Sequence, residues 1–99
     1  MKTRIDYTPA ALRDLDEIWF YLAREADIET ADRFTRQLTL ACEKITTSPR
    51  GYRFRPELAS DLRSYPHKRY VVFYYVVTHG ITIARILHSA RDIDTLFDD

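Results

Sequence analysis

The longest run of β-branched and aromatic residues lies in the last third of the chain, from Arg69 to Val77. This composition is typical of a buried strand. Thr78-His79-Gly80 follows, and glycine can take positive φ at a tight hairpin turn without steric cost. Ile81 to His88 then has the composition of a second strand running back. We therefore predict a β-hairpin around which the rest of the chain packs.

Two stretches upstream show the three- and four-residue spacing of amphipathic helices. The first begins at Thr8-Pro9, because threonine is a favoured N-cap and proline is tolerated at the first helical position. The second follows a break at Glu25-Ala26-Asp27, with Asp27 as N-cap, and ends before Pro49. The short connection predicts an antiparallel helical hairpin. Its apolar positions are Leu12, Leu15, Ile18, Trp19 and Leu22, followed by Ala31, Phe34, Leu38, Ala41, Cys42 and Ile45.

The remaining segments complete a single α+β domain over residues 1–99. Lys2–Tyr7 alternates polar and apolar residues, as a strand near a sheet edge does. Leu62–Tyr65 is a short strand, which Pro66 confines to an edge or an end. We expect an N-terminal strand, a helical hairpin packed on an antiparallel-dominated four-stranded sheet, and a short C-terminal helix over Asp92–Phe97.

The formal net charge of zero conceals an uneven distribution. Seven basic and nine acidic groups give residues 1–49 a charge of −2, eight basic and two acidic groups give residues 50–91 a charge of +6, and four aspartates give residues 92–99 a charge of −4. The basic β-rich half could face an anionic partner or be an ordinary solvated face. A neutral chain argues against strong direct binding to nucleic acid.

Several kinds of site are missing from the sequence. No stretch approaches the roughly 20 apolar residues that span a membrane. The start of the chain lacks the apolar region of a signal peptide, and a lone Cys42 fits a reducing cytoplasm. There is no glycine-rich phosphate loop and no Cys/His metal spacing, so we expect neither cofactor nor metal. No Ser/His/Asp set points to an ordinary hydrolase.

Arg85 is unusual because it interrupts an apolar strand, where an unpaired charge is costly to bury. If His79-Gly80 is a two-residue loop, paired positions sum to 159. Arg85 then stands across from Tyr74 on one face of the sheet, and His88 faces Val71 on the other. The alternative for Arg85 is a carboxylate or carbonyl partner beneath it.

The segment Arg50–Arg55 (RGYRFR) interleaves basic and aromatic residues. Such a segment can grip phosphates and stack on bases. The interpretation that we favour is a surface loop whose Tyr52 and Phe54 fold back over the core. Arg91-Asp92, after the last strand, can be a simple helix start with Asp92 as N-cap.

Four segments together resemble the ParE-like toxins, a branch of the RelE/ParE superfamily of bacterial toxin–antitoxin pairs. The segments are DLDEIWFYLARE, GYRFRPEL, LRSYPHKRYVVFYYV and IARILHSARDI. The similarity covers nearly the whole chain, and the block from Leu62 to Ile93 is its most specific part. The resemblance implies a helical hairpin on an antiparallel sheet, and a small cytoplasmic toxin held inactive by an antitoxin encoded beside it.

The branch of the superfamily determines the expected activity. ParE-like members are associated with poisoning DNA gyrase, whereas RelE-like members are ribosome-dependent ribonucleases that cut mRNA. In the ribonuclease branch an Arg commonly follows the Tyr that opens the central strand, but here Val71 follows Tyr70. A Tyr is common in their final segment, where this chain has Leu96 and Phe97. The resemblance therefore favours a non-enzymatic gyrase inhibitor.

Two alternatives remain at this point. RNA cleavage needs a cationic cluster and usually a His or Tyr to move protons. His88 and Arg91 are the catalytic candidates of a ribonuclease. The other alternative is an inactive member that binds an antitoxin and inhibits nothing.

The candidate contact residues follow from the resemblance and from the geometry of the hairpin. Antitoxins of these systems typically lay a helix or strand along an apolar groove of the toxin. The antitoxin-binding candidates are Trp19, Tyr21, Tyr52 and Phe54. The target-binding candidates are Arg63, Tyr74, Arg85, His88, Arg91 and Asp92, supported by the loop Arg50–Arg55.

Overall fold

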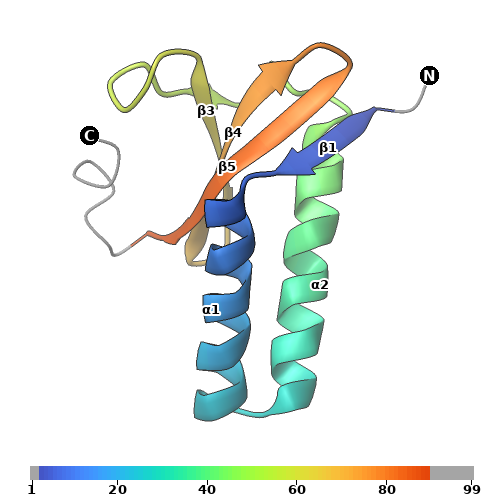
Figure 1. Cartoon of the computed structure of the whole chain (residues 1–99), viewed down its shortest axis with the longest axis vertical. Helices are drawn as coiled ribbons and strands as arrows, with labels where there is room; N and C mark the ends of the chain where they lie inside the picture. The colour runs from blue at the N-terminus through green and yellow to red at the C-terminus, as the bar shows by residue number, and fades with distance from the viewer. Residues whose placement is uncertain (1–2, 90–99) are drawn as a thin grey trace.

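Two helices lie side by side against one face of a five-stranded sheet (Figure 1). The computed structural model describes residues 3–89. Its elements are β1 (Arg4–Tyr7), α1 (Pro9–Glu25), α2 (Ile28–Ile45), β2 (Arg53–Phe54), β3 (Leu62–His67), β4 (Tyr70–Val77) and β5 (Gly80–His88). The α+β class and the helical hairpin are confirmed. The predicted helix over Asp92–Phe97 lies outside the described residues.

The sheet has the strand order β1-β5-β4-β3-β2. Only β1 is parallel to its neighbour, β5, and the other pairs are antiparallel. The predicted number of four strands was wrong, because Arg53 and Phe54, expected in a loop, form a fifth strand opposite Ser64 and Arg63. Two residues are too few for an alternating pattern to be recognised in a sequence.

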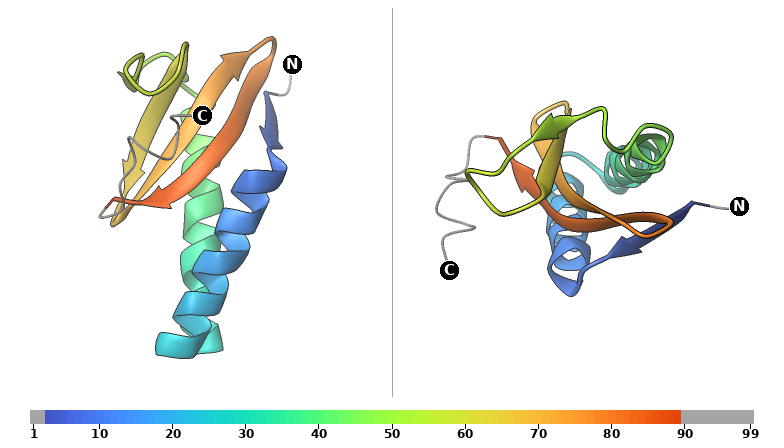
Figure 2. Two further views of the ribbon diagram at one scale, coloured as in Figure 1. Left: turned by 60° about the vertical axis from the view of Figure 1, so that its left-hand side comes forward. Right: turned by 90° about the horizontal axis from the view of Figure 1, so that it is seen from above.

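The helices begin where the sequence predicts. The Thr8 hydroxyl accepts a hydrogen bond from the Ala11 amide at 3.0 Å, and the Asp27 carboxylate accepts one from the Thr30 amide at 2.6 Å. Each contact satisfies one of the free N–H groups of the first helical turn. Both helices extend well past the end of the sheet, as the side view shows (Figure 2).

The sheet separates two apolar clusters. The larger cluster lies between the helices and the sheet, and Leu38, Cys42, Tyr74 and Ile83 are fully buried in it. The smaller one lies on the opposite face. There the loop between β2 and β3 places Leu58 against Leu62, Phe73 and Leu87.

The β4–β5 hairpin differs from the predicted register. Val77 pairs with Gly80, so the loop consists of Thr78 and His79, and the positive φ of 65° belongs to His79. Gly80 is instead required inside β5, because a Cβ there would collide with the carbonyl oxygen of Arg4 in β1. Glycine marks the close approach of a neighbouring strand here.

A β-bulge shifts the register a second time along the hairpin. Tyr74 pairs with Ile83 and Phe73 with Arg85, so the intervening Ala84 has no partner in β4. Arg85 therefore stands opposite Phe73 and not Tyr74, and His88 stands opposite Tyr70 and not Val71. The predicted pairing was wrong because it assumed a loop one residue too late and a regular ladder.

Candidate functional site

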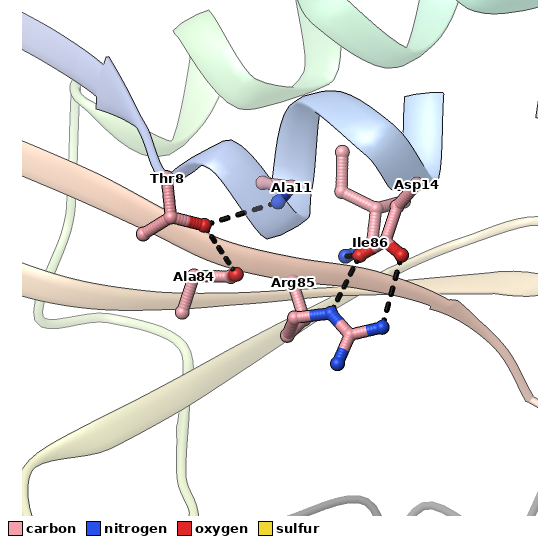
Figure 3. Close-up of polar contacts among 6 residues, drawn as sticks. All are labelled: Thr8, Ala11, Asp14, Ala84, Arg85 and Ile86. Atoms are coloured by element: carbon pink, nitrogen blue, oxygen red, sulfur yellow. Dashed lines mark hydrogen bonds and ion pairs between the residues drawn. The ribbon is translucent and has the colours of Figure 1, made fainter. Parts of the chain in front are cut away.

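The bulge in β5 is the point at which α1 is fastened to the sheet (Figure 3). The Thr8 hydroxyl donates a hydrogen bond to the carbonyl oxygen of Ala84 at 2.7 Å. Two residues further on, the Ile86 amide donates to the Asp14 carboxylate at 2.9 Å. In a regular ladder, backbone groups such as the Ala84 carbonyl and the Ile86 amide would pair with a neighbouring strand. At the bulge they form hydrogen bonds with Thr8 and Asp14 instead.

Arg85 completes this joint through an ion pair with Asp14. Its Nε and Nη2 donate to the two carboxylate oxygens at 2.8 and 3.0 Å, in a bidentate arrangement. The Asp14 side chain is 7% exposed and that of Arg85 is 28% exposed. The hydrogen bond to Asp14 raises the pKa of Arg85, so the guanidinium stays charged. The alternative prediction, a carboxylate beneath Arg85, is confirmed.

A groove of about 570 Å³ opens beside this joint, between the helices and the end of the sheet. Its apolar surface comes from Ile18, Tyr21 and Leu22 of α1, Phe34 of α2 and Ile86 of β5. Tyr21 is 50% exposed, so its ring is accessible from the groove. The volume lies in the range of roughly 300–1,000 Å³ that is typical of ligand pockets.

The rim of the groove carries charges of both signs. Lys68 and Arg69, in the turn between β3 and β4, and His88 at the end of β5 form the sheet-side rim. On the opposite side α1 contributes Glu17. Asp14 also lines the groove, but its carboxylate is already engaged by Arg85.

Aromatic contacts hold the sheet-side rim in place. The Phe34 ring lies 5.5 Å from that of Tyr70 and 5.9 Å from that of His67, and Tyr70 meets His88 edge-on at 5.2 Å. The Ser89 amide donates to the Arg69 carbonyl at 2.8 Å, which ties the end of β5 to the turn. Burial, together with the nearby charge of Lys68, lowers the pKa of His67.

A second polar cluster lies at the far edge of the sheet, around the basic and aromatic segment Arg50–Arg55. The Tyr74 hydroxyl donates to the carbonyl of Pro49 at 2.6 Å, and burial raises the pKa of Tyr74 to about 12. Arg63 donates to the carbonyl of Tyr52 at 2.9 Å, and its guanidinium lies 5.2 Å from the ring of Phe54. These contacts fold the segment back onto the sheet.

The structure places the predicted target contacts in different parts of the fold. Tyr74, expected to contact a target, is fully buried, because the register turns its ring toward the helices. Arg63 and Arg85 are held by hydrogen bonds within the protein. His88 lines the groove. Arg91 and Asp92 lie outside the described residues.

The four antitoxin candidates are also dispersed. Tyr21 is in the groove. Trp19, on another side of α1, donates its indole N–H to Asp32 of α2 at 2.7 Å. Tyr52 packs edge-on against Tyr65 at 4.7 Å, as expected for a segment folded over the core, whereas Phe54 stays 47% exposed. Of these candidates, only Tyr21 shares a site with His88.

Sequence reasoning missed several residues of the groove and of the joint beside it. Asp14 lies in helical register with the buried Ala11 and Ile18, and an acid on an apolar stripe is a detectable signal for a buried partner. Phe34 was assigned to the core alone, although it also lines the groove. Arg69 begins the predicted strand and Lys68 comes directly before it, and nothing local distinguishes such cations from ordinary surface charges.

Other chemistry is limited within residues 3–89. No group of three or more His, Cys, Asp or Glu side chains is placed to hold a metal ion there. Over the same residues, neither helix is apolar enough over a sufficient length to cross a membrane. Cys42 is fully buried, and burial raises the pKa of its thiol to about 11, so it is a poor nucleophile at neutral pH.

Comparison with known proteins identifies the family. Residues 5–93 match the family described as ParE toxin of type II toxin-antitoxin system, parDE. The chain belongs to the ParE toxin family. Toxin ParE1 of Mycobacterium tuberculosis, found in strains CDC 1551 / Oshkosh and ATCC 25618 / H37Rv, is 30% identical over 95 residues, which are 95% of this chain and 97% of the relative.

A solved structure supports the same ParE fold. A chain of the chromosomal ParDE TA system from P. aeruginosa superposes with a TM-score of 0.77 at 18% identity, over 87% of this chain and 95% of that one. At this identity the likeness concerns the fold alone. Together with the family match, it identifies the hairpin-on-sheet domain as a ParE-type toxin of a type II toxin–antitoxin system.

Proposed function

We propose that this ParE-type toxin inhibits DNA gyrase by binding to it, so that cleaved DNA accumulates and replication stalls, and that a cognate antitoxin neutralises it in the cytoplasm. The observation that carries the proposal is the ParE family match over residues 5–93. Inhibition by binding needs no cofactor and no catalytic group, and depends on complementary surfaces.

The groove between α1, α2 and the end of the sheet is the proposed antitoxin site. It combines exposed aromatic surface at Tyr21 with the apolar side chains of Leu22 and Phe34. A helix or strand that lays its apolar face into such a groove is a common mode of peptide recognition. The gyrase contacts remain proposed for His88, Arg91 and Asp92, at and beyond the end of β5.

A ribosome-dependent ribonuclease is the second candidate function, because His88 lies at an accessible rim beside Lys68 and Arg69. In that case His88 and Arg91 act as general acid or base and as phosphate ligand. The engagement of Arg63 and Arg85 within the fold counts against this candidate, since neither guanidinium is placed to hold a phosphate.

The test compares two reactions in parallel. Purified toxin is added to gyrase with relaxed plasmid and, separately, to an in vitro translation reaction. Blocked supercoiling or trapped cleaved DNA with normal translation is the expected result. Halted translation with cut mRNA would contradict gyrase as the target and support the ribonuclease. A protein that binds its antitoxin but changes neither reaction would contradict both activities.

A further inference from the structure

The two long walls of the groove differ in charge. Lys68 and Arg69 lie on the sheet-side rim, both exposed, and His88 lies beside them. The α1 wall presents Glu17, also exposed, whereas the Asp14 charge is balanced by Arg85. Ile18 and Leu22 of α1 and Phe34 of α2 add apolar lining. The groove therefore combines an apolar lining with cations on its sheet elements and the carboxylate of Glu17 on α1.

The two rim cations have no ion-pair partner among the described residues. The ion pairs among residues 3–89 are Arg4–Asp6, Arg55–Glu57 and Arg85–Asp14, so neither Lys68 nor Arg69 takes part in one there. Charged groups on an ordered turn lose less conformational freedom on binding than those on a flexible loop. This turn is ordered by the Ser89–Arg69 backbone hydrogen bond and by the contacts of Tyr70 with Phe34 and His88.

We propose that the groove takes an amphipathic segment of the antitoxin with a defined polarity. Apolar side chains of the segment contact Tyr21, Leu22 and Phe34, and an aspartate or glutamate pairs with Lys68 and Arg69. The inference rests on the proposed neutralisation by an antitoxin. Glu17 on the opposite wall repels a carboxylate and favours a basic residue, so the two walls fix the orientation of the segment.

Lys68 and Arg69 are thus specificity determinants for the antitoxin. Rim charges mainly steer association and reject wrong partners, while the apolar contacts supply most of the affinity. An antitoxin segment with the same apolar positions but exchanged charges would meet like charge on both walls. We expect the toxin to reject it.

The lysine content of the chain allows a direct test by zero-length cross-linking. A carbodiimide joins an amine to a carboxylate only where the two are in contact. The sequence has three lysines, Lys2, Lys44 and Lys68, and Lys44, near the end of α2 and outside the groove, is the internal control. In the complex with the antitoxin encoded beside the toxin, peptide mapping should join Lys68 to an antitoxin Asp or Glu. Cross-links at Lys44 without any at Lys68 would overturn the inference.

Charge reversal tests the energetic role of the same rim. Lys68→Glu/Arg69→Glu should weaken antitoxin binding by about tenfold or more at low salt, and flatten its salt dependence, because exposed charge pairs are screened by ions. The matched control is Arg33→Glu/Arg36→Glu on the exposed face of α2, outside the groove. We expect the control to bind within about twofold of the wild type.

The design separates folding, neutralisation and polarity. Should the charge-reversed variant not fold, Lys68→Asn/Arg69→Gln removes both charges instead. Asparagine tolerates the positive φ of 55° at position 68. If the wild type binds the antitoxin and these variants bind equally well, the inference fails while the proposed function stands. If the wild type binds no antitoxin, the proposed neutralisation fails, and the inference fails with it.

Discussion

Asp14 accepts three hydrogen bonds, two from the Arg85 guanidinium and one from the Ile86 amide, while only 7% of its side chain is exposed. Removing the carboxylate would leave a partly buried cation and a buried amide without a partner. Removing Arg85 would leave the Asp14 carboxylate with one hydrogen bond of the three, from the Ile86 amide. The two deletions therefore leave different groups without a partner, although they break the same ion pair.

We expect Asp14→Ala to lower the free energy of unfolding by about 3 kcal/mol, near the lower end of the cost of breaking a buried pair, because Arg85 keeps some access to water. Arg85→Ala should also cost about 3 kcal/mol or more, because it leaves the buried Asp14 carboxylate without its cation, although the Ile86 amide keeps its acceptor. Urea denaturation at neutral pH measures both values. A loss below about 1 kcal/mol for either variant would contradict the role of the ion pair in the joint.

Two buried acids make the fold sensitive to alkali. Burial raises the pKa of Cys42 from 9.0 to about 11, and that of Tyr74 from 10.0 to about 12. Because both values are higher in the folded state, this stability is complete below pH 9 and is lost as pH rises from 9 to 12. Thermal melts should show this decline. Cys42→Ala should reduce its slope between pH 9 and 11, and an unchanged slope would contradict the burial effect.

His67 has the opposite pH dependence. Burial, followed by the charge of Lys68, lowers its pKa below 6.5, and its Nε2 atom has no hydrogen-bond partner among the residues that the structure describes. The unfolded chain therefore binds the proton more readily, and stability falls as pH drops through and below 6.5. His67→Phe should retain the contact with Phe34 and flatten this acid limb in denaturation at pH 5 and 7. If His67→Phe keeps the full loss of stability at acid pH, a group other than His67 causes that loss.

Several residue roles can be predicted from the sequence because they are local. The caps Thr8 and Asp27 depend on their own helices, and an arginine in an apolar strand requires a partner wherever the strand lies. The burial of Tyr74 could not be predicted, because it depends on the register of the hairpin. The function of the rim cations Lys68 and Arg69 depends on a helix wall that is distant in sequence.

The helices and long strands follow from periodicity and composition, whereas the sheet details do not. The bulge at Ala84 is favoured by the contacts of Thr8 with Ala84 and of Asp14 with Ile86, which are separated by 76 and 72 positions in the sequence. No local pattern in β5 signals it. In the same way β2 is formed by pairing with β3 and by the contacts of Arg63, not by its own two residues.

The pairing of β1 with β5 depends on one glycine. We expect Gly80→Ala to cost about 2–3 kcal/mol and to expose the β1 amides to hydrogen exchange, because the new methyl group meets the backbone of Arg4. Gly51→Ala is the matched control. Its methyl group would meet the Ser48 side-chain oxygen at 2.8 Å, and that group can rotate away. The control should change stability by less than about 1 kcal/mol.

An equal effect of the two glycine substitutions would contradict the close approach of the strands. Amide exchange distinguishes local from global effects in this comparison. Selective loss of protection at Arg4 and Thr8, whose amides donate to His79 and Ile83, would locate the damage in the β1–β5 pair.

Over the described residues, charge divides between the first and second halves of the chain. Residues 3–45, which contain β1 and both helices, carry six basic and nine acidic groups, and residues 46–89, which contain the rest of the sheet, carry seven basic and two acidic groups. The groove lies where the layers meet, and this explains its walls of opposite charge. The predicted basic half therefore coincides with the sheet apart from β1.

The end of the hairpin provides a test of toxicity at this scale. We expect Arg91→Ala to abolish growth inhibition while thermal stability and antitoxin binding stay near those of the wild type, because Arg91 is proposed to contact the target. Arg36→Ala, an exposed arginine of α2, is the matched control and should remain toxic. A large loss of thermal stability in Arg91→Ala would assign Arg91 to the fold.

The position of β5 in the sheet has a consequence for protein synthesis. Both β1 and α1 are made first, yet they pair with and are fastened to β5, the last described element to leave the ribosome. With synthesis at about 5–20 residues per second, the early segments wait several seconds for their partner strand. A nascent chain cannot form the groove or the hairpin end before Gly80–His88 emerges. The proposed inhibitor therefore has no assembled groove to offer a partner until this strand has left the ribosome.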